Sequence, residues 1–219
     1  MSEIYGEQHR LVQQEFDTAK LADRVKELIV LREITEEHKP FIETRDMFFL
    51  TTIDHRGYPT CSYKGGEPGF VKVVDKKTIA FPSYNGNGMF LSVGNINANS
   101  KVGMLFIDFE TPHRVRVHGT ASVSKHDRLT PEFPGAELVV RVTVTEVFVN
   151  CPRYIHRYQC VQTSKYVPRT DFESPLTPQW KRIDAIQDVL PEREKSNAEK
   201  LGRTITPEEY GVLLTKGEG

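Results

Sequence analysis

Two sets of side chains near the middle of the sequence have the chemistry to hold a phosphate-bearing ligand. The first is a polar loop with two glycines, SYNGNG, which runs from Ser83 to Gly88. The second is formed by Arg114, Arg116 and His118, which alternate with apolar residues and therefore share one face of a predicted strand. Backbone amides, hydroxyl groups and cationic side chains all bind phosphate oxygens. The sequence therefore predicts a local anion site.

Each of these features also has a purely structural explanation. Asn-Gly, which occurs twice in the loop, is the commonest dipeptide of tight turns. Against a simple turn, the loop leads into a helix predicted over residues 89–96, whose first amides would be free to bind an anion. The loop matches neither a P-loop nor a dinucleotide fingerprint. Alternating charges often form a solvated strand face, and Lys72 within its apolar strand suits an exposed edge as well as a ligand.

The elements that must position these residues are predicted to form an antiparallel sheet over residues 46–150. Runs of β-branched and aromatic residues bounded by turn signals predict strands over 47–53, 59–63, 70–74, 78–81, 102–109, 114–123 and 138–149. The run from Val102 to Phe109 is apolar on both faces, which favours a barrel with one face inside and the other against a helix or a partner. The predicted fold is mainly β, a β-barrel with flanking helices.

The segments on either side of the sheet are predicted to be helical. Residues 1–45 form an arm, because Leu21, Val25 and Leu28 recur at helical spacing. Residues 151–219 form loops and helices packed on the barrel, with one helix predicted from Pro178 to Leu190 and a capping box at 206–209. The polar stretch 191–203 is predicted to be a linker. The predicted organisation is therefore an arm, 1–45, a barrel domain, 46–150, and a tail, 151–219.

Composition excludes several classes of partner. The formal net charge is −1, from 29 basic and 30 acidic residues, so no global field attracts nucleic acid or an anionic membrane. The three cysteines lack metal-site spacing and fit a reducing compartment. The first residues lack the features of a secretory leader, and no segment approaches the ~18 consecutive apolar residues of a membrane span. These observations predict a cytoplasmic protein with no metal site.

The order and spacing of several motifs resemble those of a known family. Lys72 in its apolar strand, Phe81-Pro82 at the end of the next strand, the polar loop, and HRVRVHG over 113–119 resemble the pyridoxamine 5'-phosphate oxidase-like FMN-binding proteins. The resemblance covers about residues 45–150. It implies an FMN-binding split barrel and a homodimer with flavin sites at the subunit interface.

The resemblance also implies which residues bind the flavin. Lys72 would lie beside it, the end of the following strand would contact it, the loop would hold its phosphate, and Arg114 would touch the ring system or its tail. The cofactor-binding residues predicted in this way are Lys72, Pro82, Ser83, Tyr84, Asn85, Gly86, Asn87, Gly88, Met89, Arg114 and Arg116. The vitamin B6 oxidase itself has an Arg-Lys pair at the positions of Gly88 and Met89, which points to an uncharacterised branch of the family.

The function implied is that of an FMN-dependent oxidoreductase acting on a small-molecule substrate, with electrons from a nicotinamide nucleotide or a reduced substrate. No residue is identified as a catalytic acid or base, because in such proteins the cofactor carries the chemistry. Three alternatives stay open: a non-catalytic flavin- or haem-binding module, a deazaflavin-dependent reductase, and a structural dimer without a cofactor. The segment 150–158 either covers the barrel or forms a flap over the site, and Trp180 and Arg182 are candidates for late flavin contacts.

Overall fold

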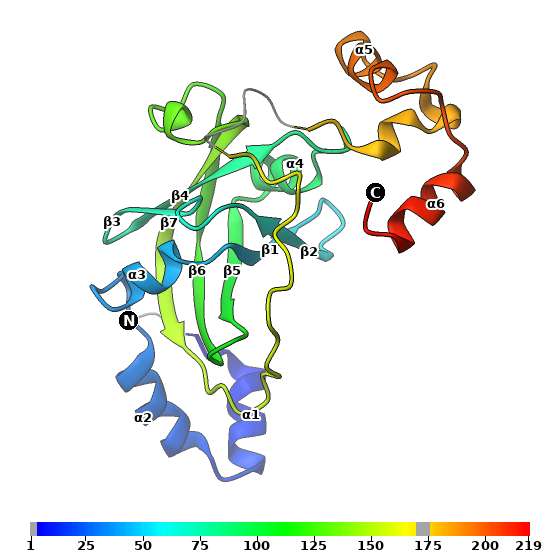
Figure 1. Cartoon of the computed structure of the whole chain (residues 1–219). Coiled ribbons are helices and arrows are strands. Elements are labelled where there is room, and N and C mark those ends of the chain that lie inside the picture. Colours follow the sequence, from blue (N-terminus) through cyan, green and yellow to red (C-terminus); the bar gives the residue numbers. More distant parts are fainter. Residues whose placement is uncertain (1–3, 170–175) are drawn as a thin grey trace. The chain divides into compact units, whose positions relative to one another are not determined.

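The computed structural model describes residues 4–169 and 176–219. The chain divides into two compact units, Met1–Val161 and Gln162–Gly219 (Figure 1). The start of the predicted arm, residues 1–3, and residues 170–175 of the predicted tail lie outside the described residues. The sheet belongs entirely to the first unit.

The first unit is built on one antiparallel sheet with the strand order β2-β1-β5-β6-β7-β4-β3. Its strands are β1 (Met47–Ile53), β2 (Pro59–Gly65), β3 (Lys72–Asp75), β4 (Thr78–Tyr84), β5 (Lys101–Asp108), β6 (His113–Ser124) and β7 (Ala136–Val149). The predicted mainly β fold with flanking helices is confirmed. Each predicted strand is present, with bounds that differ by a few residues.

The sheet curls so that its two ends approach each other. Strands β2 and β3 are consecutive in the sequence but form the opposite edges, so residues 66–71 cross from one edge to the other. Phe48 on β1 and Phe81 on β4 belong to strands four places apart in the order of the sheet, yet their ring centroids are only 5.0 Å apart. Contacts of this kind are possible only in an open barrel, because a flat sheet would hold these strands far apart.

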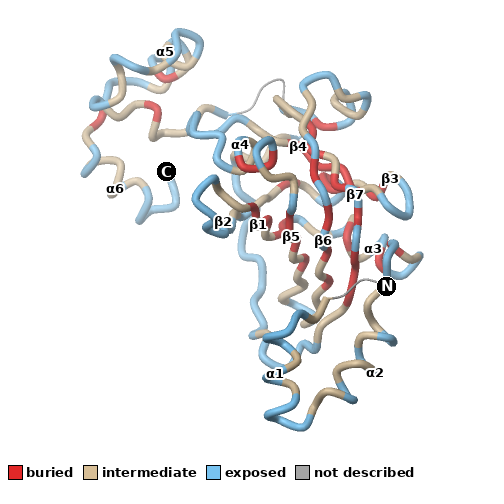
Figure 2. Tube along the Cα trace, turned by 180° about the vertical axis from the view of Figure 1, so that it is seen from behind, coloured by how far each residue is buried: buried red, intermediate tan, exposed pale blue. Residues whose placement is uncertain are grey.

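Aromatic rings fill the interior of this barrel. Phe48 is completely buried, and its ring centroid lies 5.9 Å from that of Phe70 and 5.1 Å from that of Phe106. Figure 2 shows buried residues running along the central strands. On β5 the buried residues alternate with half-buried ones such as Leu105, so the single chain buries one face of this strand completely and leaves the other for a further contact.

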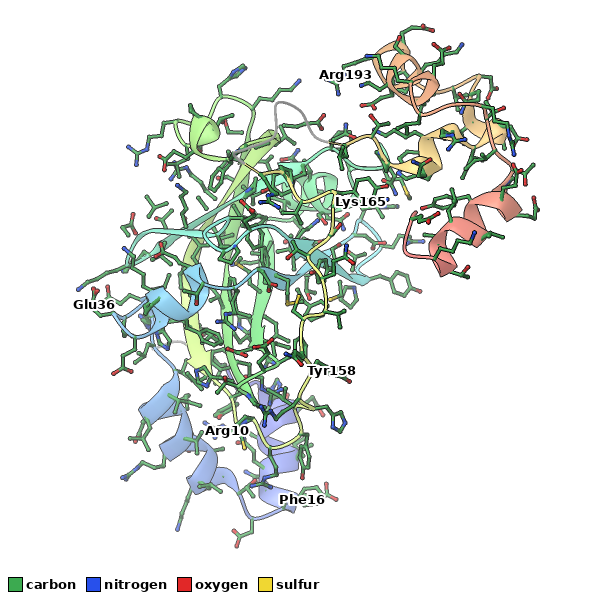
Figure 3. The ribbon with its side chains drawn as sticks, viewed as in Figure 1. Arg10, Phe16, Glu36, Tyr158, Lys165 and Arg193 are labelled. Atoms are coloured by element: carbon green, nitrogen blue, oxygen red, sulfur yellow. The ribbon has the colours of Figure 1, made fainter. Side chains whose placement is uncertain are left out.

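Helices flank the sheet, as predicted. They are α1 (Glu7–Glu15), α2 (Ala19–Ile29), α3 (His38–Glu43) and α4 (Leu91–Ala98), with a short 3-10 turn η1 (Thr130–Glu132). Arg10 on α1 pairs with Asp23 on α2 at 2.7 Å, which ties the two helices of the arm together (Figure 3). Helix α4 follows the predicted polar loop, where a helix was expected.

The second unit differs from the prediction in two places. Two 3-10 turns, η2 (Gln179–Arg182) and η3 (Asp184–Ile186), replace the α-helix predicted over 178–190. Trp180, Ile183 and Ile186 recur every three residues, which matches the 3-10 period better than the α-helical one.

The predicted linker at 191–203 contains a helix instead, α5 (Glu192–Glu199). It is rich in the strong helix formers Glu, Lys and Arg, and Lys181 pairs with Glu194 on it at 2.6 Å. The capping box is confirmed: Thr206 Oγ1 accepts from the backbone N–H of Glu209 at 3.2 Å, at the start of α6 (Pro207–Thr215). None of the helices in the described ranges is both long and apolar enough to cross a membrane.

Candidate functional site

A cavity of about 190 Å³ lies where the two ends of the curled sheet approach each other. Its walls come from β1, β2, β4, β7 and helix α4, all within the first unit. The lining residues are Leu50, Tyr63, Lys64, Gly65, Phe70, Phe81, Pro82, Ser83, Tyr84, Ser92, Val93, Ile96 and Val140. Because small-ligand pockets usually span roughly 300–1,000 Å³, this cavity suits the charged end of a ligand rather than a whole nucleotide.

Lys64 brings an amine into the cavity from the inner face of β2. It stands opposite Phe48 in the β1–β2 register, so both side chains lie on the core-facing side of the sheet. The Nζ of Lys64 donates a hydrogen bond to Ser92 Oγ at 3.2 Å, and Ser62 Oγ lies 3.2 Å from the same oxygen. Among the described residues, no carboxylate pairs with this amine. Burial therefore lowers the pKa of Lys64, because water is removed and no anion replaces it.

Tyr84 supplies a second polar group to the same cavity. Burial raises the pKa of its phenol to about 12, and the carboxylate of Glu67 acts in the same direction. The phenol is therefore protonated at neutral pH and can donate a hydrogen bond. With the hydroxyls of Ser83 and Ser92, which also line the cavity, it forms a set of donors around the amine of Lys64. This set has the chemistry of a phosphate site.

The predicted phosphate loop is only partly at the cavity. Ser83 and Tyr84 belong to strand β4 rather than to the loop, and they line the cavity together with Pro82. The remaining predicted residues, 85–89, are exposed and are not among the lining residues. Asn85 Nδ2 donates to Glu137 Oε1 at 3.0 Å, and Asn87 Oδ1 accepts from the Met89 N–H at 3.1 Å.

Backbone conformation explains why this loop carries its second glycine. Gly88 has a φ of 80°, and Phe90, at the N-cap of α4, has a φ of 48°. Glycine adopts positive φ without strain, whereas a side chain such as that of Phe90 does so at a cost. The two positive φ values turn the chain from β4 into α4, and they bring Ser92 and Val93 of that helix to the cavity wall.

Lys72 lies elsewhere. Its amine pairs with Glu132 Oε2 on η1 and lies 5.4 Å from the ring centroid of Phe133. It is not among the residues that line the cavity. Because the carboxylate of Glu132 already neutralises this amine, Lys72 offers less to a phosphate than Lys64 does.

Arg114 and Arg116 lie on β6, which is separated from β3 by β7 and β4. Lys72 and Arg114, which were both predicted to bind the flavin, therefore do not lie on adjacent strands of the single chain. The Arg114 guanidinium donates to the carbonyl oxygen of Cys151 at 2.9 Å, and that of Arg116 lies 5.6 Å from the ring centroid of Phe148. The assignment of these residues to the cofactor stays a prediction.

Neither Lys64 nor Ser92 was predicted from the sequence to be a site residue. A signal for Lys64 was present, because Ser62 and Lys64 alternate with bulkier residues along the strand that begins at Pro59. The alternation did not say which face would be inside, since that depends on the register against β1. Ser92 gave no signal of its own.

The segment after β7 packs along its own unit as an extended chain. Tyr158 (labelled in Figure 3) donates its backbone N–H to the carbonyl oxygen of Phe109 at 3.1 Å, and the two rings meet edge to face at 5.5 Å. Arg157 Nε donates to the carbonyl oxygen of Glu110 at 3.0 Å. The segment thus covers the turn between β5 and β6, and no helix begins there.

Comparison with known proteins identifies the family. The sequence profile of the family described as pyridoxamine 5'-phosphate oxidase matches residues 34–151, more than half of the chain. The chain belongs to this family, as the sequence motifs indicated, and its sheet is that of the split-barrel fold. The matched residues include every strand of the sheet and helix α4, and therefore the whole cavity.

Solved structures with the same fold have low sequence identity to this chain. HupZ of Group A Streptococcus is 20% identical, with a TM-score of 0.44 over 57% of this chain and 99% of that one. A putative pyridoxamine 5'-phosphate oxidase from Lactobacillus delbrueckii is 26% identical, with a TM-score of 0.42 over 54% and 99%. An FMN-binding protein from Syntrophomonas wolfei is 12% identical, with a TM-score of 0.40 over 64% and 97%. No curated protein matches the chain.

Proposed function

We propose that this protein binds FMN, with the phosphate in the cavity beside Lys64, and that it acts as an FMN-dependent oxidoreductase on a small-molecule substrate. The observation that carries the proposal is the half-buried amine of Lys64, which has no carboxylate partner among the described residues and faces a cavity lined by hydroxyl groups. Membership of the pyridoxamine 5'-phosphate oxidase family supports the choice of a flavin.

The residues present suit a phosphate monoester. A dianionic phosphate accepts several hydrogen bonds, and Lys64, Ser83, Tyr84 and Ser92 offer an ammonium and three hydroxyl groups around one cavity. Their positions on β2, β4 and α4 make the site rigid, because the sheet and a helix hold each group. The absence of an Arg-Lys pair at Gly88 and Met89 is thus offset by donors on other elements.

Bound FMN would supply hydride or electron transfer, and the protein would orient it and exclude water. The cavity is too small for the ring system, which would extend beyond it. Its described lining contains no His, Asp or Glu. A nicotinamide nucleotide or a reduced substrate is the proposed electron donor.

We also propose a homodimer in the cytoplasm. The half-buried outer face of β5 supports the second copy, because Leu105 and Ile107 would lose their remaining exposure to water on association. The three cysteines of the sequence are all free and exposed, which fits a reducing compartment.

A titration with FMN and riboflavin tests the proposed function. The two flavins differ only in the phosphate, so their difference in affinity isolates its contribution. A charge-assisted contact is worth about 1.5–3 kcal/mol, which corresponds to roughly tenfold to hundredfold tighter binding of FMN. The measurement is quenching of flavin fluorescence by flavin-free protein. Equal affinities for the two flavins would show that the phosphate does not bind in this cavity. A visible spectrum typical of haem or of a deazaflavin in the purified protein would show that the cofactor is not FMN.

The polar loop can be tested separately with Gly86→Val. A Cβ at Gly86 meets no other atom within 4 Å, and Gly86, unlike Gly88, does not have a positive φ, so the fold should persist. If the loop backbone approaches the phosphate, the added side chain should lower FMN affinity about tenfold or more while riboflavin affinity changes little. Unchanged FMN affinity in the folded variant would show that residues 85–89 lie outside the phosphate site, and Gly86→Ala serves as the smaller matched change.

A further inference from the structure

A second and larger hollow lies on the outer face of the sheet, across β1, β5, β6 and β7. Its volume is about 550 Å³, which falls within the range of small-ligand pockets. It shares none of its lining residues with the cavity beside Lys64. The hollow is therefore a candidate binding site separate from the proposed phosphate site.

A missing side chain on β5 creates part of this space. Gly103 stands opposite His118 in the β5–β6 register, and a Cβ built on it would lie 3.9 Å from both His118 Cδ2 and Thr51 Cβ. A methyl group therefore fits at this position, whereas a larger side chain would occupy the hollow. On the other side of β6, the register of β7 shifts next to Glu146. Such β-bulges change the direction of nearby side chains and are common beside binding sites.

The ionisable groups of the hollow are mostly basic. Arg116, Lys101 and His118 line it, and Glu146, the one acid among its described lining residues, is already engaged with His118. The His118 Nδ1 lies 3.2 Å from Glu146 Oε2, and the Glu146 side chain is only 8% exposed. The carboxylate thus fixes the imidazole, whose other nitrogen has no partner among the described residues.

Arg116 has no counter-ion among the described residues, and neither has the exposed Lys101. The guanidinium of Arg116 lies beside the ring of Phe148, and no carboxylate pairs with it in the part of the chain that the structure describes. Burial lowers the pKa of Arg116, and the neighbouring Arg114 on the same strand face adds to this effect. An anion on this half-buried face would stabilise the charge of Arg116 and reduce its repulsion by Arg114.

We propose that this hollow binds a small organic acid, a carboxylate carried on an apolar or aromatic body. The planar fork of Arg116 matches a carboxylate with two parallel hydrogen bonds, and the free nitrogen of His118 can contribute another. Ile53 and Leu105 line the same hollow and would contact the apolar body. In a homodimer formed through this face, the second copy would enclose the ligand. The inference does not depend on FMN binding.

Benzoate is the probe for this site, and benzamide is its uncharged counterpart of the same shape. Calorimetric titration of the full chain should detect benzoate binding at least tenfold tighter than benzamide binding. Arg116→Gln should weaken benzoate binding about tenfold to hundredfold, the loss expected for one charge-assisted pair. Arg128→Gln, a change of the same kind at an exposed position outside the hollow, should leave it unchanged.

A second pair of variants tests the hollow itself. Gly103→Leu should abolish benzoate binding because its side chain fills the space, while Gly103→Ala should retain it, with the fold of both checked by circular dichroism. Benzoate binding that neither Arg116→Gln nor Gly103→Leu weakens would overturn the proposal, as would the absence of benzoate binding to the wild type.

Repeating the benzoate titration with saturating FMN separates this ligand from the flavin. Unchanged benzoate affinity supports two sites. The inference would be overturned if FMN and benzoate compete and Arg116→Gln weakens FMN binding as much as benzoate binding. Arg116 would then belong to the flavin site. Should the protein bind no FMN, the benzoate results would still stand, so the two proposals can fail independently.

Discussion

Lys64→Met should weaken FMN binding about tenfold to hundredfold and abolish the preference for FMN over riboflavin. Lys64 is the one cation among the described residues that line the cavity, and the loss of a charge-assisted contact to phosphate is worth roughly 1.5–3 kcal/mol. Methionine fills similar space without charge, so the barrel should fold normally. Fluorescence titrations with both flavins measure the two affinities, and the riboflavin value reports any damage unrelated to the phosphate.

Two other lysines make this experiment specific. Lys77, exposed in the turn between β3 and β4, provides the matched control, and Lys77→Met should leave both affinities unchanged. Lys72→Met tests whether Lys72, as the sequence predicted, or Lys64 contacts the phosphate. A large loss of FMN affinity in Lys72→Met, with none in Lys64→Met, would show that the phosphate binds at the face of β3 and not in the cavity beside Lys64.

The affinity should also depend on pH in a defined direction. Burial lowers the pKa of Lys64 in the free protein, so the amine loses its proton at a lower pH than an exposed lysine does. FMN affinity should therefore fall as the pH rises through this lowered pKa. It should also fall below a pH of about 6, where a phosphate monoester gains its second proton. Lys64→Met should lose the alkaline decrease and keep the acidic one.

Phe48→Ala should lower the free energy of unfolding of the first unit by about 3–5 kcal/mol. Phe48 is fully buried, and its ring contacts those of Phe70, Phe81 and Phe106 from three other parts of the barrel. Truncation leaves a cavity at the point where the ends of the sheet meet, and the surrounding rings can close it only partly. Urea unfolding followed by far-ultraviolet circular dichroism measures the loss.

The same substitution at an exposed phenylalanine provides the comparison. Phe16 at the end of α1 is 69% exposed (Figure 3), so Phe16→Ala should change stability by no more than ~0.5 kcal/mol. A loss at Phe48 below ~1 kcal/mol would contradict the packing described here, since no fully buried ring in a closed core can be removed so easily.

How far the sequence predicted the fold depends on whether a feature was local. The alternation of Arg114, Val115, Arg116 and Val117 identified β6 because a strand has a period of two. The capping box at 206–209 was readable because all its hydrogen bonds lie within one turn. By contrast, the strand order depends on pairings between distant residues, so the separation of β3 from β6 could not be read from either strand.

The candidate site illustrates the same limit. Lys72 and Lys64 each occur in a strand, and the family resemblance assigned only Lys72 to the flavin. The two lysines differ in their surroundings: Lys64 stands opposite the buried Phe48, whereas Lys72 pairs with Glu132. Pro82 and Ser83, which the family resemblance assigned to the flavin, line the cavity, but the resemblance could not show that loop residues 85–89 lie outside the lining.

The Lys64 amine, which has no carboxylate partner among the described residues, destabilises the folded protein when no ligand is present. Holding a charged group in a half-buried cavity without a counter-ion destabilises the folded state, so flavin-free Lys64→Met should be more stable than the flavin-free wild type. Saturating FMN should reverse this order, because a ligand that binds only the folded chain adds to its stability. Since cells degrade unfolded chains continuously, the amount of this protein would then rise and fall with the supply of flavin.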